Sequence, residues 1–232
     1  MTVEDHAGPF LVHARLRRDR PAQALARVLV PQEDGARLGA AHSLVWALFA
    51  DAPDRRRDFL WRETRPGEFL ILATRQPADH HDLFLLEHKP FAPTLYTGQR
   101  LRFDLRVNAV ISVPAGPGSR GKRRDVVTAA LARLDAPERA AAREETIREV
   151  AALWLVKRAV GAGFRIDPGE VLIAAEEWVR IPRERGRPVA FSALTIKGAL
   201  TVVDAPRFLA AMIAGFGAAK AFGCGLMLIR RA

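Results

Sequence analysis

The sequence is poor in cysteine, with Cys224 the only one among 232 residues. One thiol excludes an intramolecular disulfide and a cysteine-based metal cluster. The sequence also lacks an apolar run of the roughly 20 residues that crossing a bilayer requires, and its first residues have no secretory signal pattern. We therefore expect a soluble, cytoplasmic protein.

Acidic residues are scarce relative to basic ones. The sequence has 36 Lys and Arg against 26 Asp and Glu, a formal net charge of +10 at pH 7. This excess favours a polyanionic partner, with nucleic acid ahead of an acidic membrane surface. Because 49% of the residues are hydrophobic, the chain is long enough and apolar enough for one large domain or two small ones.

The spacing of apolar residues predicts strands and helices in a repeated order. The first half is expected to form elements at residues 10–16, 21–30, 36–49, 58–61, 68–72 and 83–86. The second half is expected to form them at residues 101–107, 136–160, 171–174, 189–203, from 205, and 226–229. This order predicts an α+β fold of two tandem ferredoxin-like βαββαβ domains, residues 1–95 and 96–232.

One stretch near the C-terminus combines four glycines with Lys220. The glycines are Gly215, Gly217, Gly223 and Gly225. Glycine permits positive φ and close backbone approach, and successive amides in such a turn can bind an anion. The stretch therefore predicts either a phosphate-binding loop or a tight helix-to-strand turn in which the glycines only make room.

His42 is the candidate for proton transfer, because an imidazole titrates near neutral pH. In the predicted helix it shares a face with Val45 and Trp46, so it could equally be a core histidine. Ser43 follows it directly, yet adjacent helical residues point in different directions, which argues against a Ser–His nucleophilic pair.

Two basic segments are candidates for phosphate contacts. Lys122, Arg123 and Arg124 end a loop that nearly matches a nucleotide-binding P-loop, but Arg123 stands where that motif needs Ser or Thr. The other segment is a predicted hairpin tip that could follow the phosphates of a duplex. Its arginines are Arg180, Arg183, Arg185 and Arg187. Both segments could instead be ordinary solvated charges.

A metal site is not predicted. His80, His81 and Asp82, with His88 further on, lack the helical spacing of a zinc-binding HExxH motif. Cys224 has no base beside it in the sequence and is expected to be a small buried residue. We therefore expect neither a metal nor a cofactor.

Together these residues resemble the CasE family, the repeat-processing endoribonucleases of type I-E CRISPR systems. The glycine stretch matches the family pattern of two Gly-apolar-Gly triplets with a basic residue between them, here Lys220. Residues 198–206 resemble the strand and helix start that precede this loop, and residues 57–61 resemble a strand of the first domain. Residues 42–49 resemble the helix that carries the catalytic histidine of the family.

The resemblance implies a metal-independent ribonuclease that cuts CRISPR repeat RNA at the base of its hairpin. The ribose 2′-hydroxyl would attack the adjacent phosphate with His42 as acid or base, leaving a 2′,3′-cyclic phosphate and a 5′-hydroxyl. The protein would keep the mature crRNA and join other Cascade subunits. One departure is Gly39, which stands where the family often has a tyrosine; the only tyrosine of this chain is Tyr96.

Two other functions stay open. The chain could be a non-catalytic RNA-binding subunit on the same fold, in which His42 is structural. It could also be an acyl or nucleotidyl transferase that uses the glycine stretch for a nucleotide.

Overall fold

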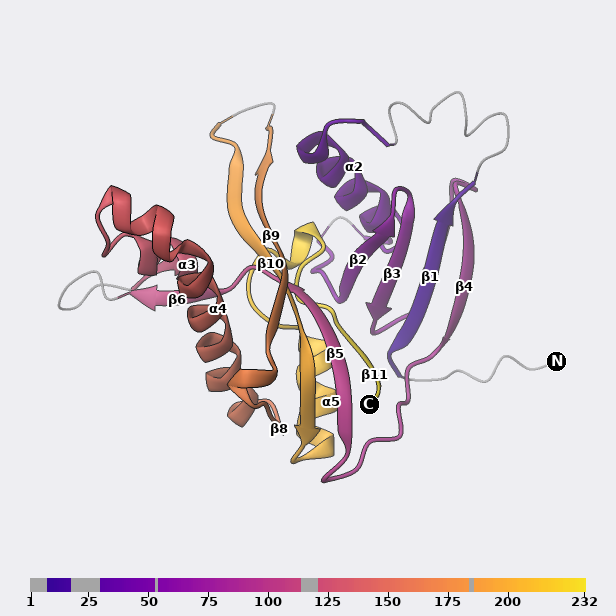
Figure 1. Cartoon of the computed structure of the whole chain (residues 1–232). Coiled ribbons are helices and arrows are strands. Elements are labelled where there is room, and N and C mark those ends of the chain that lie inside the picture. Colours follow the sequence, from indigo (N-terminus) through magenta and orange to yellow (C-terminus); the bar gives the residue numbers. More distant parts are fainter. Residues whose placement is uncertain (1–7, 18–29, 53, 114–120, 184–185) are drawn as a thin grey trace.

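The computed structural model describes residues 8–17, 30–52, 54–113, 121–183 and 186–232. It contains two main antiparallel sheets, one from each half of the chain, which stand side by side (Figure 1). No helix in these ranges is long and apolar enough to cross a membrane. The helix expected at residues 21–30 lies, except for its last residue, outside the described ranges.

The first sheet has the strand order of a ferredoxin-like domain. Its neighbours run β2-β3-β1-β4, so the two strands nearest each other in the chain, β2 and β3, form one edge pair. The strands are β1 (Phe10–Leu16), β2 (Phe59–Arg65), β3 (Glu68–Ala73) and β4 (Phe84–Pro90). Residues 74–83 form a loop, where a βαββαβ unit would have its second helix.

Helix α2 (Asp34–Ala47) covers one face of this sheet because its apolar residues recur at helical spacing. Leu44 and Val45 of the helix are buried against aromatic residues of the strands, and so is Leu48, which directly follows the helix. The strand side of this core includes Phe59, Trp61, Phe69 and Ile71. His42 lies on the same helix, between the buried Ala41 and Val45.

The second sheet repeats the order, with β11-β5-β10-β8 as neighbours and β9 also paired to β10. Its strands are β5 (Arg100–Val107), β8 (Phe164–Arg165), β9 (Leu172–Ile181), β10 (Val189–Val202) and β11 (Met227–Arg231), and its helices are α4 (Ala136–Gly161) and α5 (Ala205–Ala214). Side chains of α4 and α5 form one core with the sheet. The predicted α+β fold of two ferredoxin-like units is therefore confirmed.

The sequence did not predict the additions to this second unit. They are the hairpin of β6 (Val110–Val113) and β7 (Lys122–Asp125), the helix α3 (Val126–Leu131), and the 3-10 turns η1 (Pro168–Glu170) and η2 (Lys220–Phe222). The chain passes from one sheet to the other between Pro90 and Arg100. The exact domain boundary at residue 95 stays a prediction.

The two units touch where α2 meets β9 and η2. At Gly35, an added Cβ would lie 2.0 Å from the carbonyl oxygen of Arg180, so the backbones of α2 and β9 are in direct contact. Leu38 packs beside it in a small cluster that includes Ile181 and Phe222. A second cluster joins Leu60 and Leu72 of the first sheet to Leu226 of the second unit, next to Phe91, Ile213 and Leu228.

We predict that Gly35→Ala destabilises the protein, because the methyl group would push α2 off β9. Such overpacking costs about 1–3 kcal/mol, and urea unfolding measures it. Gly39→Ala is the matched control, since its Cβ would meet only Ile181 Cγ2 at an ordinary 3.5 Å. That variant should keep or raise stability, by up to about 1 kcal/mol. Equal effects of the two substitutions would contradict the close contact at Gly35.

Candidate active site

His42 lies on α2 at the point where this helix meets η2 of the other unit. Its ring centroid is 5.4 Å from that of Phe222 and 6.1 Å from that of Trp46. The side chain is half-buried, and Nδ1 is a buried atom with no hydrogen-bond partner in the described ranges. A buried polar atom without a partner costs about 1–3 kcal/mol, which is more typical of a functional site than of a core.

The surroundings of His42 favour its neutral form. Burial lowers the pKa of His42 below its ordinary 6.5, because the charged imidazole loses hydration. The backbone carbonyl of Ala221 acts in the opposite direction, and repulsion from the Arg57 guanidinium lowers the pKa further. A neutral imidazole at pH 7 can accept a proton.

Arg57 lies close enough to His42 to repel its charged form, and Lys220 stands at the start of η2, the turn that contacts α2. Lys220 donates a hydrogen bond from Nζ to the Ala214 carbonyl at 2.6 Å. Burial and repulsion from Arg57 lower the pKa of Lys220, and burial lowers that of Arg57. Arg57 therefore lies within electrostatic reach of both His42 and Lys220.

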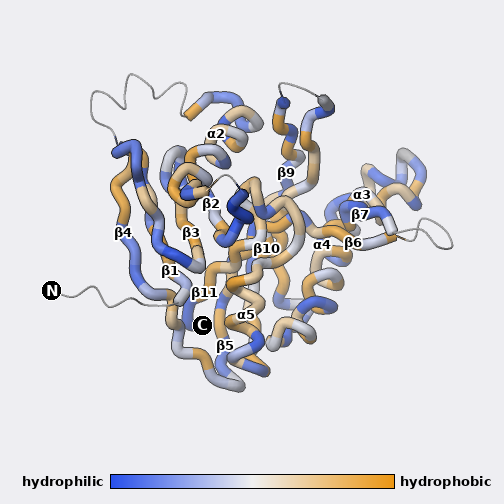
Figure 2. Tube along the Cα trace, turned by 180° about the vertical axis from the view of Figure 1, so that it is seen from behind, coloured by the Kyte–Doolittle hydropathy of each residue, from blue (hydrophilic) through white to orange (hydrophobic). Residues whose placement is uncertain are grey.

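Carboxylates do not neutralise this charge in the described ranges. None of the ion pairs found there includes Lys220 or Arg57. The nearest carboxylate in sequence, Asp58, pairs with Arg75 at 2.6 Å instead. The site is therefore suited to an anion such as a phosphate. Arg57 was not expected as a site residue, although it begins the quoted motif at residues 57–61, and its segment is among the most hydrophilic of the chain (Figure 2).

The four glycines of the C-terminal loop serve its packing. All have positive φ, between 71° and 95°. A Cβ would lie 2.6 Å from Leu60 Cδ1 at Gly215 and 2.4 Å from Val107 Cγ2 at Gly217. Gly223 and Gly225 are buried. The glycines thus let the loop fit between the two units.

Several loop amides are already used inside the protein. The N–H of Phe216 donates to Gly225 O, that of Ala218 to Asn108 O, and that of Gly225 to Arg106 O, at 2.8–3.0 Å. These groups are not free to cradle a phosphate. The geometry supports the tight-turn interpretation of the loop, which brings Phe222 against His42. Direct RNA contacts of the glycines stay a prediction.

The other predicted basic residues lie in two different places. Arg180 and Arg183 are exposed near the tip of the β9–β10 hairpin, which rises beside α2 (Figure 1). Arg185 lies outside the described ranges. Lys122, Arg123 and Arg124 are exposed on β7, on the far side of the second sheet from α2. The hairpin therefore adjoins the His42 site, whereas the β7 cations do not.

The remaining candidates show no chemistry near His42. No group of three or more His, Cys, Asp or Glu side chains in the described ranges could hold a metal ion. Burial raises the pKa of the Cys224 thiol to about 11, so this residue is no nucleophile at neutral pH. Gly39 faces Ile181, so β9 occupies the space beside the position where a tyrosine was expected.

Comparison with known proteins gives a consistent picture. The family model described as CRISPR associated protein matches residues 10–231. The CRISPR-associated endoribonuclease Cse3 of Thermus thermophilus is 34% identical over 150 residues, which cover 61% of this chain and 60% of that relative. The CRISPR system Cascade subunit CasE of Escherichia coli is 25% identical over 208 residues, or 88% of this chain and 96% of that relative.

The fold is also similar to that of solved structures. A CRISPR endoribonuclease Cse3 bound to a 19-nucleotide RNA superposes with a TM-score of 0.68. The sequences are 25% identical, and the match covers 97% of this chain and 99% of the other.

We predict that His42 titrates below pH 6.5 in an NMR experiment, and that Arg57→Gln moves the midpoint of this titration upward by removing a repelling charge.

The lowered pKa of His42 in the folded state also means that unfolded chains bind more protons than folded chains in this pH range. Stability should therefore be full above pH 6.5 and fall as the pH drops toward the folded pKa. His42→Gln should remove this part of the pH dependence. A midpoint at or above 6.5 would contradict the proposed environment.

Proposed function

The chain belongs to the CRISPR-associated protein family whose model matches residues 10–231, and on this premise we propose that it is an endoribonuclease that cuts CRISPR repeat RNA. It cleaves at the base of the repeat hairpin, keeps the product, and acts as a subunit of a Cascade complex. One observation carries the proposal: a half-buried imidazole with an unpaired nitrogen lies near Arg57, which in turn lies near Lys220, and no described carboxylate pairs with either cation. A cytoplasmic location stays a prediction.

The 2′-hydroxyl of the RNA is the nucleophile, so the protein need not supply one. Neutral His42 accepts the hydroxyl proton while the 2′-oxygen bonds to phosphorus, and the bond from phosphorus to the 5′-oxygen breaks. The leaving 5′-oxygen takes up a proton from water, and His42 returns its proton to water, which gives a 2′,3′-cyclic phosphate and a 5′-hydroxyl. Arg57 and Lys220 stabilise the negative charge that grows on the phosphate oxygens. Alignment of the RNA, with the 2′-oxygen in line with the bond that breaks, supplies the rest of the rate enhancement.

The β9–β10 hairpin holds the RNA duplex near this site. Arg180 and Arg183 are exposed on it, next to the α2 helix that carries His42. A-form RNA is recognised mainly through its shape and backbone, for which arginines are suited. The exposed cations of β7 are too far to one side to serve the same phosphates, and they could bind a distant part of the transcript.

A nucleotide-dependent transferase is the weaker alternative. It would need the glycine loop as a phosphate cradle, yet the amides of Phe216, Ala218 and Gly225 are bonded within the protein. The other alternative, a non-catalytic RNA-binding subunit, has the same fold and charges and differs only in the role of His42.

His42→Ala decides between the catalytic and the non-catalytic subunit. We expect cleavage of repeat RNA to fall by at least about 100-fold, the usual share of a proton-transfer group, while the affinity for the hairpin changes little. His81→Ala, at an exposed loop histidine, is the matched control and should cleave normally. Cleavage by His42→Ala at the wild-type rate would contradict a catalytic role for His42.

A second pair of variants tests the cationic site. Arg57→Ala should lower the cleavage rate by about 100-fold under single-turnover conditions, because it removes one group that stabilises the transition state. Its neighbour Arg56 is exposed, so Arg56→Ala is the control: it removes one positive charge from a position outside the site. If both variants lose activity equally, only overall charge matters and Arg57 has no special role.

A further inference from the structure

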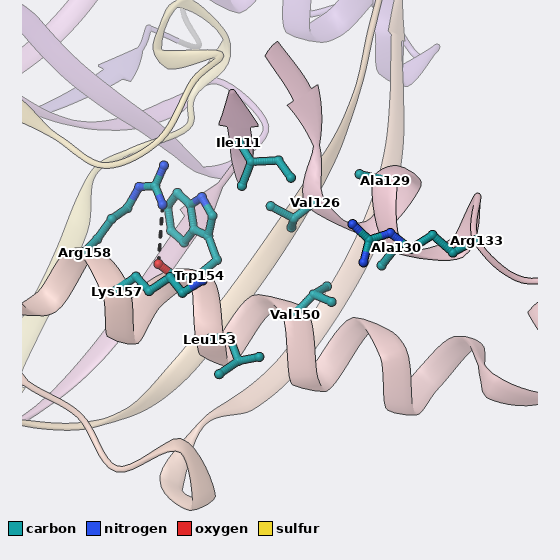
Figure 3. Close-up of a pocket in the computed structure, with 10 residues that line it drawn as sticks. All are labelled: Ile111, Val126, Ala129, Ala130, Arg133, Val150, Leu153, Trp154, Lys157 and Arg158. Atoms are coloured by element: carbon teal, nitrogen blue, oxygen red, sulfur yellow. Dashed lines mark hydrogen bonds between the residues drawn. The ribbon is translucent and has the colours of Figure 1, made fainter. Parts of the chain in front are cut away.

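A groove outside the candidate active site lies between α3 and α4, below the β6–β7 hairpin (Figure 3). It holds a cavity of about 270 Å³. Apolar side chains from three elements line it, among them Ile111 of β6, Val126 of α3 and Leu153 of α4. It lies on the far side of the second sheet from α2 in both views of the chain (Figures 1 and 2).

The apolar lining extends onto the open surface. Leu153 is 55% exposed and Val160, two helical turns further along α4, is 77% exposed. Ile111 is also among the exposed large hydrophobic residues. Single exposed apolar residues are common, but several exposed apolar residues in and near one cavity are typical of a docking surface.

Cations stand at the edge of this apolar surface. The Arg158 guanidinium lies 3.9 Å from the centroid of the Trp154 ring and donates a hydrogen bond to Val110 O at 2.9 Å. It is therefore held in one place, with part of its donor capacity unused. Arg133 and Lys157 lie beside the same cavity. None of the three belongs to an ion pair among the described residues.

The chemistry of the groove favours a protein over RNA or a second copy of this chain. Trp154, the aromatic residue of the lining, is buried and has Arg158 over its ring, so it offers no open face on which a base could stack. A second copy would bring another net charge of +10 against these cations.

We propose that this groove docks a segment of another protein subunit, one that places an apolar side chain among Ile111, Val126 and Leu153 and carboxylates on Arg133, Lys157 and Arg158. The inference rests on the proposed function, because the partner would be another subunit of the Cascade complex. The groove and the His42 site face different sides, so the chain can hold RNA with one and a subunit with the other.

The first test is assembly of the complex from the chain, its cognate Cascade subunits and repeat RNA. Leu153→Asp and Lys157→Glu should each weaken incorporation of the chain roughly tenfold or more, while RNA cleavage stays at the wild-type rate. Leu85→Asp is the matched control, since Leu85 is 44% exposed on β4 of the other sheet. Normal incorporation of both groove variants would overturn the proposal. If the wild-type chain does not cleave repeat RNA, that result would instead count against the proposed function.

A photo-crosslinking amino acid at position 153 identifies the occupant in the assembled complex. A crosslink to a protein subunit at an acidic segment supports the proposal. A crosslink to RNA, a crosslink to a second copy of this chain, or no crosslink at all would each overturn it.

Discussion

The close contact of α2 with β9 and η2 holds the candidate site together. His42 belongs to the first unit and Lys220 to the second, so their positions depend on how the two units pack. Gly35 allows the backbones of α2 and β9 to touch. The Trp61 indole N–H donates to Ala221 O at 3.2 Å and ties η2 to the first sheet. The first unit alone would keep His42 and Arg57 but would lack Lys220 and Phe222 of η2.

Charge is the second constraint on the site. Arg57 and Lys220 are partly desolvated and repel each other, which costs folding free energy until an anion arrives. Their neighbour Asp58 would relieve this cost, but its carboxylate is held by Arg75. The fold thus keeps a positive site open beside a neutral base. The phosphodiester of an RNA would pair with the cations, and the adjacent 2′-hydroxyl would donate a hydrogen bond to the unpaired nitrogen of His42.

The fold was largely predictable because its units are repeated and its helices and strands have clear periodicity. Apolar spacing placed α2, α4 and most strands within a few residues. The strands of the β6–β7 hairpin have four residues each, β6 mostly apolar and β7 mostly basic, and are too short to give such a signal. His42 and Lys220 were singled out from motifs, and their roles stay predictions. Arg57 was not singled out, because the observations that draw attention to it are its own burial and the pairing of Asp58 with Arg75. The glycines were recognised, but only the contacts with Leu60 and Val107 show that they make room.

The most direct test of this account is a structure of the complex with a repeat hairpin that carries a 2′-deoxy nucleotide at the cleavage site and so cannot be cut. The account predicts the scissile phosphate beside Arg57 and Lys220, with the 2′ position about 3 Å from His42 or one water away. A scissile phosphate bound at the β7 cations, remote from the imidazole, would contradict it.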